Sequence, residues 1–505
     1  MPGSCTSGNS VVTCLGRLKV VIMVAHAFPP EGNAGVYRTL RFVRHLPTKG
    51  WSPSVVSANM SSYERHDPEL LQLVPSSTEV IRVTSCDPWQ SIQTRRAQRI
   101  QKRLSDSSLK GAVRLPGPRL RPVLREAVRR AEAWCYHPDM AMGWIRPATD
   151  ATVNMAARKQ ADVIWATAGP VSSFIVAERA SLRTGVPYVL DFRDAWTITY
   201  NDFDARRPAW ATLTDRRRLH RLLAGAQAVT FRYHAEAECY WRAYPGALDV
   251  FRIHIIPNGY EGSIEESAIP NSGDRCTVLY AGTLSSYRYD TLLRAVRWLK
   301  ESDPARAARL RLHFVGEGME ALATEAAILG VSDLVETRGP TSHGEIARLQ
   351  REAHAVLVLG RPPTMKGHEL FAGAKLFSYL KAGRPIVGVL PSDETKRILH
   401  RVGVSTVADG DSSSEIVAMF QRLLDAWSAG TLHSLVPNPV ECDAYSAERQ
   451  TAALACALEG KPAKNPFVPN SVEVPLSLRW EIAAMRPATT PAGTQRRDGN
   501  VFLRP

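Results

Sequence analysis

The stretch that decides the fold is "RLKVVIMVA" at 17–25, followed by "FPPEGNAGVYRTL" at 28–40. The first run is apolar and of strand length, and Pro29 and Pro30 end it because proline cannot donate to a sheet ladder. Apolar residues then recur at helical spacing, at Val36, Leu40, Val43 and Leu46. A buried strand that passes through a glycine-containing loop into a helix begins a βαβ unit.

The same alternation continues along the chain in two series, with helical patterns between most of the strands. The remaining apolar runs of the first series lie at 53–59, 79–85, 161–168, 187–192 and 226–231, and those of the second at 276–282, 310–316, 353–360 and 384–390. Continuous Val/Ile/Leu strands between helices predict parallel sheets with both faces covered. The expected fold class is α/β, with two doubly wound Rossmann-like domains.

Length and composition limit the number of domains and the class of protein. The chain has 505 residues, which is too long for one core, and its 44% hydrophobic and 22% charged content is typical of a folded globular protein. Its eight cysteines form no C-x-x-C pair, so we expect a reduced, cytoplasmic chain without structural metal. The run at 20–28 also resembles the apolar region of a signal peptide, but the sixteen uncharged residues before Arg17 favour a strand.

The net charge of +14 is concentrated in one segment. Residues 91–130 hold twelve Lys and Arg against Asp106 and Glu126, a local balance of +10. Apolar residues around it, Trp89, Ile92, Ile100 and Leu104, lie near one face of a helix, so the segment fits an anionic membrane surface. A solvated basic face without a partner is the alternative. A nucleic-acid site is disfavoured because no aromatic residues alternate with the basic ones.

Loops at the ends of the first series of strands are candidates for ligand contacts, because doubly wound sheets bind ligands there. The first loop contains Gly32, Asn33, Gly35 and Arg38, and it leads into a helix N-terminus that suits an anion. "DFRDAW" at 191–196 places charges after a strand, and "HIIPNGYE" at 254–261 contains Asn258 and Gly259. Each has a structural alternative: a plain turn, or an ion pair between Asp191 and Arg193.

The second series offers a matching set. "LYAGTLSSYR" and "HFVGEGME" each place glycine directly after a strand, at Gly282 and at Gly316 and Gly318. "GHELFAGAKLFSYLKAGRPIVGV" places Lys375 and Tyr379 one turn apart on a helix that ends at Gly383.

Together these motifs resemble the GT-B glycosyltransferases of the large, mostly retaining family that uses nucleotide sugars. The motifs that carry the resemblance, in the family's order, are "FPPEGNAGVYRTLRFVRHLPTKGW", "PDMAMGWIRPA", "DFRDAW", "IPNGYE", "YAGTL", "FVGEG" and "KLFSYLKAGRPI". The resemblance covers roughly 18–460. It implies an acceptor domain at 18–255, a donor domain at 256–435 and a crossover helix at 436–460 that packs on the first domain. The composition of the tails at 1–17 and 461–505 predicts that they are disordered.

The resemblance also implies a reaction: transfer of a sugar from a nucleotide-diphosphate sugar to an acceptor hydroxyl, with retention, without metal and without a further cofactor. The departing diphosphate gains negative charge, which helix N-termini, backbone N–H groups and cationic side chains stabilise. Arg288, Lys375 and Gly282 with its following helix are the candidates for that role. Gly316, Glu317 and Gly318 would contact the nucleoside, and Asp194 the acceptor hydroxyl. The other expected substrate contacts are Gly32, Asn33, Gly35, Arg38, Asn258, Gly259, Thr283, Ser378 and Tyr379.

Three features depart from the family's pattern: the pair of glutamates, a histidine and a lysine. Ser378 stands where many relatives have the second of two glutamates, and Glu369 is one residue out of register for the first. Phe174 replaces a common histidine, and Arg288 stands near the place of a common lysine. These changes leave open an atypical donor site, a nucleotide-sugar-binding protein without activity, and a sugar-nucleotide 2-epimerase. The expected acceptor is a glycan, a lipid-linked or a small molecule, and the expected location is the cytoplasm or the inner face of the membrane.

Overall fold

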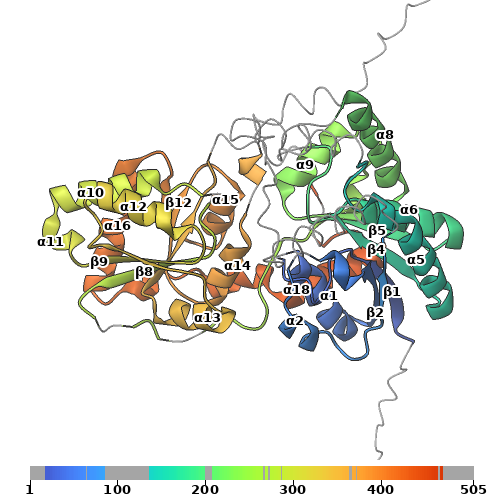
Figure 1. The fold of residues 1–505 in the computed structure, drawn as a ribbon, viewed down its shortest axis with the longest axis horizontal. Coiled ribbons are helices and arrows are strands. Elements are labelled where there is room, and N and C mark those ends of the chain that lie inside the picture. The colour runs from blue at the N-terminus through green and yellow to red at the C-terminus, as the bar shows by residue number, and fades with distance from the viewer. Residues whose placement is uncertain are drawn as a thin grey trace, which may run out of the picture.

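The computed structural model describes residues 17–85, 136–198 and 208–469, apart from positions 34, 64, 266–267, 271–272, 286, 363–366, 371 and 465–466. The basic segment at 91–130 and the tails at 1–16 and 470–505 lie outside the described residues. The two α/β domains stand side by side in Figure 1.

The N-terminal domain is built on a seven-stranded parallel sheet of order β3-β2-β1-β4-β5-β6-β7. Its strands are β1 (Lys19–Val24), β2 (Trp51–Ala58), β3 (Val80–Val83), β4 (Val163–Thr167), β5 (Tyr188–Phe192), β6 (Ala228–Phe231) and β7 (Ile253–Ile255). The helices are α1 (Val36–His45), α2 (Glu69–Gln72), α5 (Ile145–Lys159), α6 (Ser172–Thr184), α8 (Ala209–Gly225) and α9 (His234–Ala243). The strand order reverses between β1 and β4, where doubly wound folds place their ligand.

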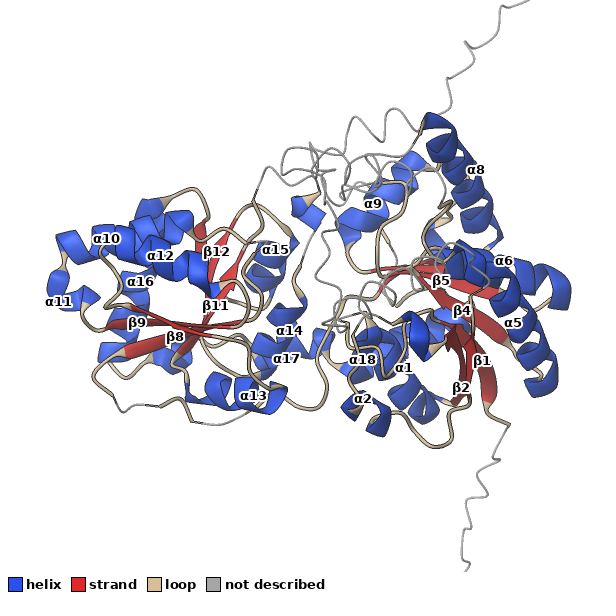
Figure 2. Cartoon of the chain, viewed as in Figure 1, coloured by secondary structure: helices blue, strands red, loops and turns tan. Residues whose placement is uncertain are grey.

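The C-terminal domain repeats this architecture on a six-stranded parallel sheet of order β10-β9-β8-β11-β12-β13. Its strands are β8 (Cys276–Ala281), β9 (Leu310–Val315), β10 (Val335–Arg338), β11 (Ala355–Leu359), β12 (Ile386–Leu390) and β13 (Val407–Asp409). Its helices are α10 (Asp290–Ser302), α11 (Pro304–Ala307), α12 (Met319–Ile328), α13 (His343–Glu352), α14 (Ala374–Lys381), α15 (Glu394–Arg401) and α16 (Ser413–Ser428). Helices cover both faces of each sheet (Figure 2), which confirms the predicted fold class.

The apolar runs became strands because both of their faces are covered. From Val20 to Val24, β1 is buried throughout, and β1 pairs with both β2 and β4. The sequence patterns missed β10 and β13. Both are edge strands of the second sheet; β10 is four residues long with alternating exposure, and β13 is three residues long. Edge strands this short carry no continuous apolar run.

The chain crosses between the domains twice, and the two crossings touch. After β7 it enters the C-terminal domain through 256–265, and it returns through α17 (Pro439–Cys442) to α18 (Ala447–Leu458). The N–H of Tyr260 donates to the carbonyl of Tyr445, and the N–H of Ala447 donates to the carbonyl of Tyr260, both at 3.0 Å. Helix α18 lies beside α1 (Figure 1), where Leu454, Ala457 and Leu458 join the core formed by β1, β2 and α1.

The prediction of a disordered segment from 461 onward is wrong for its first residues. Phe467 is only 2% exposed and belongs to the core of the N-terminal domain, where its ring stacks on His234 and lies against Trp241. A single aromatic anchor in a segment rich in proline and asparagine produces no periodicity, so sequence patterns cannot reveal it.

Candidate active site

A cleft of about 990 Å³ lies between the domains, at the carboxyl ends of the strands of both sheets. Twelve of the sixteen predicted site residues line it: Asn33, Gly35, Arg38, Asp194, Asn258, Gly259, Gly282, Thr283, Gly316, Glu317, Lys375 and Ser378. The cleft therefore brings together strand-end loops that are up to 345 residues apart in sequence, counted from Asn33 to Ser378. The other four, Gly32, Arg288, Gly318 and Tyr379, do not line it.

Lys375 is the central cation on the C-terminal side of the cleft. It lies in the first turn of α14, and its ammonium donates to the Tyr280 hydroxyl at 2.8 Å and to the Thr283 carbonyl at 3.1 Å. The ring centres of Tyr280 and Tyr287 lie 4.4 and 4.9 Å from Nζ. Within the described chain, no carboxylate lies at ion-pair distance from this ammonium. Its charge is therefore available to an anion in the cleft.

Gly282 makes room for that lysine. Its φ is +131°, and a Cβ at this position would lie 2.0 Å from Lys375 Cε. The loop that starts at Gly282 is also tied to the loop after β9: the Gly282 N–H donates to the Val315 carbonyl at 2.7 Å, and the Thr283 hydroxyl donates to the Glu317 carboxylate at 3.1 Å. The two glycine loops thus form one surface next to the ammonium.

Affinity for a nucleoside diphosphate is expected to fall as the pH rises through about 8. Burial lowers the pKa of Lys375 from 10.5 to about 8, because it penalises the charged form. A diphosphate binds the protonated form of Lys375. At a pH above the pKa of Lys375 in the free protein, the lysine must therefore take up a proton when the diphosphate binds, and Kd rises about tenfold per pH unit. Calorimetric titration with UDP from pH 7 to 10 measures this.

The matched variant for that titration is Lys375→Arg, whose guanidinium stays charged over the whole range. Its Kd is expected to vary little between pH 7 and 10. The same loss of affinity in both proteins would assign the titration to another group.

Arg38 and Asp191 form an ion pair at the floor of the cleft, which the sequence analysis did not predict. Arg38 Nη2 lies 2.7 Å from Asp191 Oδ1, and the two side chains are 2% and 0% exposed. The hydroxyls of Thr167 and Thr230 also donate to this carboxylate, at 2.7 and 2.5 Å. The Arg38 charge and these hydrogen bonds outweigh burial, so the pKa of Asp191 is lowered.

The structural alternative of an Asp191–Arg193 pair is therefore wrong. Arg193 instead pairs with its neighbour Asp194 at 3.1 Å, and it donates to the Gly169 carbonyl at 2.8 Å. The Asp194 side chain is 57% exposed and lines the cleft, as predicted. Gly169 has φ +83°, and a Cβ there would lie 2.0 Å from Arg193 Nη2. The absence of a side chain at Gly169 therefore leaves room for the Arg193–Asp194 pair.

Two predicted residues are held elsewhere. Arg288 forms ion pairs with Asp290 and Asp411, and these contacts raise its pKa. The helix expected directly after Gly282 begins only at Asp290, so its N-terminus follows an eight-residue loop. Tyr379 is 1% exposed, and its hydroxyl accepts from the Ala281 N–H at 2.8 Å, which fixes α14 to the end of β8.

The positions that depart from the family's pattern have ordinary surroundings. Ser378 is exposed at the cleft, and its hydroxyl donates to the Lys375 carbonyl at 2.8 Å. Phe174 is fully buried and packs on Phe192, with ring centres 4.9 Å apart. The position that a histidine occupies in the family that the sequence resembles is therefore part of the apolar core in this chain.

Several cleft residues were not among the predicted set: Gly169, Arg193, Arg232, Lys381 and Gln350 among them. Gly169 and Arg232 each follow a predicted strand, in "TAGP" and "VTFR", so the rule that found the other loops also indicates them. Lys381 is the last residue of α14, six residues after Lys375, and it also lines the cleft. It adds a second lysine to the donor side of the cleft.

Two facing doubly wound domains, a cleft at their strand ends and a last helix that returns to the first domain define the GT-B fold. Solved structures agree. The apo form of the lipopolysaccharide outer core galactosyltransferase WaaB is 12% identical, with 87% of this chain and 99% of its own covered and a TM-score of 0.51. The trehalose 6-phosphate synthase of Burkholderia multivorans is also 12% identical, with 88% and 97% covered and a TM-score of 0.53.

A third structure is that of the G117R mutant of S. aureus TarM in complex with Fondaparinux, alpha-GlcNAc-glycerol and UDP. It is 9% identical, with 87% of this chain and 99% of its own covered and a TM-score of 0.50. No protein-family model matches the chain, and no curated protein matches it by sequence. In the part of the chain that the structure describes, no helix is both long and apolar enough to cross a bilayer.

Proposed function

We propose that this protein is a glycosyltransferase that moves a hexosyl group from a nucleotide-diphosphate sugar to an acceptor hydroxyl, with retention and without a metal ion. The observation that carries the proposal is the Lys375 ammonium. It lies at the cleft, beside the Gly282 loop, and no carboxylate of the described chain pairs with it. The GT-B fold places a donor on this domain in the proteins that the sequence resembles.

The donor side supports departure of a diphosphate. When the bond between sugar and diphosphate breaks, negative charge grows on the phosphate oxygens, and a preorganised cation stabilises that charge more than it stabilises the bound donor. Lys375 supplies one such cation and Lys381 a second, and both line the cleft. Because two protein cations are available, we propose that the reaction does not need a divalent metal.

The acceptor side supports binding of a hydroxyl group. Asp194 is exposed at the cleft, and Arg193 holds its carboxylate in place. A carboxylate accepts a hydrogen bond from an acceptor hydroxyl and favours its deprotonation as the new bond forms. In a front-face reaction no carboxylate of the protein attacks the sugar, so Ser378 in place of a glutamate is compatible with turnover.

Product analysis with a panel of nucleotide sugars tests the proposal against its alternatives. We expect a glycosylated acceptor and free nucleoside diphosphate from one member of the panel, at an unchanged rate in the presence of a chelator. Release of a free epimerised sugar would instead identify a 2-epimerase, and binding without turnover would identify a binding protein. Loss of activity with chelator, restored by manganese or magnesium, would contradict metal independence.

We also propose peripheral contact with an anionic membrane, and α8 supports it. Trp210 and Leu213, each 49% exposed, share one face of this helix with the exposed residues Arg217 and Arg221. His137 contacts the Trp210 ring at 5.5 Å, which brings the segment with Met140, 48% exposed, to the same end of the helix. Exposed aromatic and aliphatic side chains beside arginine suit a membrane interface.

Sedimentation with anionic vesicles is expected at low salt and is expected to be lost at high salt. Removal of 91–130, or the double change Trp210→Ala and Leu213→Ala, should reduce the bound fraction several-fold, because each removes charge or apolar contact area. Ile328→Ala is the control, since Ile328 is 78% exposed on the other domain. Equal sedimentation of all variants, or none by the intact protein, would reject a membrane role.

A further inference from the structure

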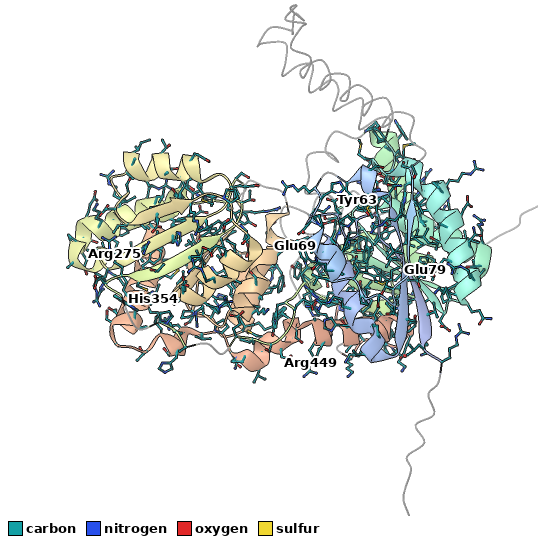
Figure 3. The ribbon with its side chains drawn as sticks, turned by 60° about the horizontal axis from the view of Figure 1, so that its bottom comes forward. Tyr63, Glu69, Glu79, Arg275, His354 and Arg449 are labelled. Carbon is teal, nitrogen blue, oxygen red and sulfur yellow. The ribbon has the colours of Figure 1, made fainter. Side chains whose placement is uncertain are left out.

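A second cavity, of about 440 Å³, lies at the junction of the domains and is separate from the cleft. Its walls come from three parts of the chain: β7 and the start of α9, helix α15 of the C-terminal domain, and α17 to α18 on the return crossing. Arg449, at the bottom centre of Figure 3 beneath the junction, lies on its rim. Arg232 lines both this cavity and the cleft, so the two hollows share a wall.

One residue that lines the cavity has a buried hydrogen-bonding atom without a partner among the described residues. His254 is 2% exposed, and its Nε2 makes no hydrogen bond in the described structure. Burial lowers the pKa of His254 to about 4, so the ring is neutral near pH 7. A hydrogen bond to the Lys461 backbone acts in the opposite direction and raises the pKa, and Nε2 is left without a partner within the described chain. An occupant with a hydroxyl or N–H group would satisfy it.

The rim of the cavity has an excess of positive charge. Its two carboxylates are neutralised, because Glu394 pairs with Arg397 at 2.8 Å and Asp443 pairs with Arg449 at 2.6 Å. Arg401 donates only to the Tyr445 hydroxyl, at 3.3 Å, and among the described residues neither Arg401 nor Lys464 has a carboxylate at ion-pair distance. The remaining wall is largely apolar, with the rings of Tyr233 and Tyr445 beside Ile398.

We propose that this cavity is a second ligand site, which binds a small phosphate ester that carries hydroxyl groups. A hydroxyl donates to His254 Nε2, the phosphate binds Arg401 and Lys464, and the tyrosine rings cover the apolar face of the ligand. Sugar phosphates and nucleoside monophosphates share this chemistry, and 440 Å³ is enough for either. In the described structure, His254 Nε2 lacks a partner that a hydroxyl would supply. Among the same residues, Arg401 and Lys464 lack an anion that a phosphate would supply.

Such a ligand would connect the two domains. Arg401 belongs to the C-terminal domain, whereas His254 lies in the N-terminal sheet and Lys464 follows α18. A molecule that contacts all three residues binds most tightly to the domain arrangement that brings these residues together. Binding therefore increases the population of that arrangement, and with it the corresponding form of the cleft. The site therefore regulates donor binding and does not take part in the transfer itself.

Calorimetric titration of the full chain with glucose 6-phosphate and, separately, with UMP tests the proposal and distinguishes the two sources of phosphate. At least one is expected to bind in the presence of saturating UDP, which occupies the cleft. Arg401→Ala and Lys464→Ala should each weaken that binding about tenfold or more, because each removes a charge-assisted contact. Lys396→Ala is the matched control: it removes a lysine from α15 that does not line the cavity.

His254→Phe tests the acceptor nitrogen, and it too should weaken binding of the phosphate ester while UDP affinity is unchanged. Arg401 is exposed, so its variant tests the site even if the histidine variant does not fold. Displacement of the phosphate ester by UDP would overturn the proposal, since the ligand would then occupy the cleft. Equal affinity of the Arg401, Lys464 and Lys396 variants, or no binding of either probe at millimolar concentration, would also overturn it.

Discussion

Lys375→Ala is expected to lower kcat/KM for the nucleotide sugar by about a hundredfold or more. Its ammonium is the cation that lies against the Gly282 loop, and the tyrosine rings around it exclude water that could replace it. A charge held in place before the reaction contributes most to the transition state, so the loss is expected mainly in kcat. Steady-state kinetics with the preferred donor measures it.

Stability provides the control for this variant. Burial lowers the pKa of Lys375, so the protonated side chain lowers the free energy of unfolding, with the full effect below about pH 8. The alanine variant removes this cost and is expected to have a melting temperature at pH 7 no lower than that of the parent. Lys300→Ala removes a lysine from an ion pair with Asp333 on the same domain and should leave kcat/KM unchanged. A Lys375→Ala protein with parental rate constants would show that the donor phosphates lie elsewhere.

Asp191→Ala is expected to lower the free energy of unfolding by about 3–5 kcal/mol, the cost of removing one partner of a buried ion pair. The substitution leaves the Arg38 guanidinium 2% exposed without its carboxylate, and it leaves the hydroxyls of Thr167 and Thr230 without their acceptor. Denaturant unfolding of the full chain, monitored for the N-terminal domain, gives the difference.

The matched control is Asp150→Ala, which removes the carboxylate of an exposed pair with Arg183 in the same domain. Their side chains are 53% and 50% exposed, so a change of less than about 1 kcal/mol is expected. If the two aspartate variants lower the free energy of unfolding equally, the buried Arg38–Asp191 pair does not stabilise the fold more than the exposed Asp150–Arg183 pair does.

Sequence patterns predicted the strands that consist of consecutive buried residues. They missed the features that depend on contacts between residues far apart in the chain. Buried strands such as β1 and β4 stand out because nearly every residue is covered, whereas the half-exposed β10 does not. The cleft loops were found because they follow such strands. The ion pairs of Arg38 and Arg193 were not predicted. Arg38 lies 153 residues from its partner Asp191, and no spacing rule links two such positions.

The same limit applies to the donor side of the cleft. Lys375 was recognisable from its motif, but the burial that lowers its pKa, and its contact with the Tyr280 ring, arise only when α14 packs at the end of β8. Arg288 had an equally suggestive position, and the carboxylates of Asp290 and Asp411 hold it away. The competition between a ligand and a protein partner for one cation is decided in three dimensions.

The return of the chain to its first domain has a consequence for biosynthesis. Leu454, Ala457 and Leu458 complete a core whose other members include Val21 and Trp51, so that core can close only after residue 458 has left the ribosome. The C-terminal domain, by contrast, has its whole sheet between residues 276 and 409. During vectorial synthesis it can therefore finish folding first, although it is translated second, while the half-built N-terminal domain keeps an apolar surface exposed for a chaperone to cover.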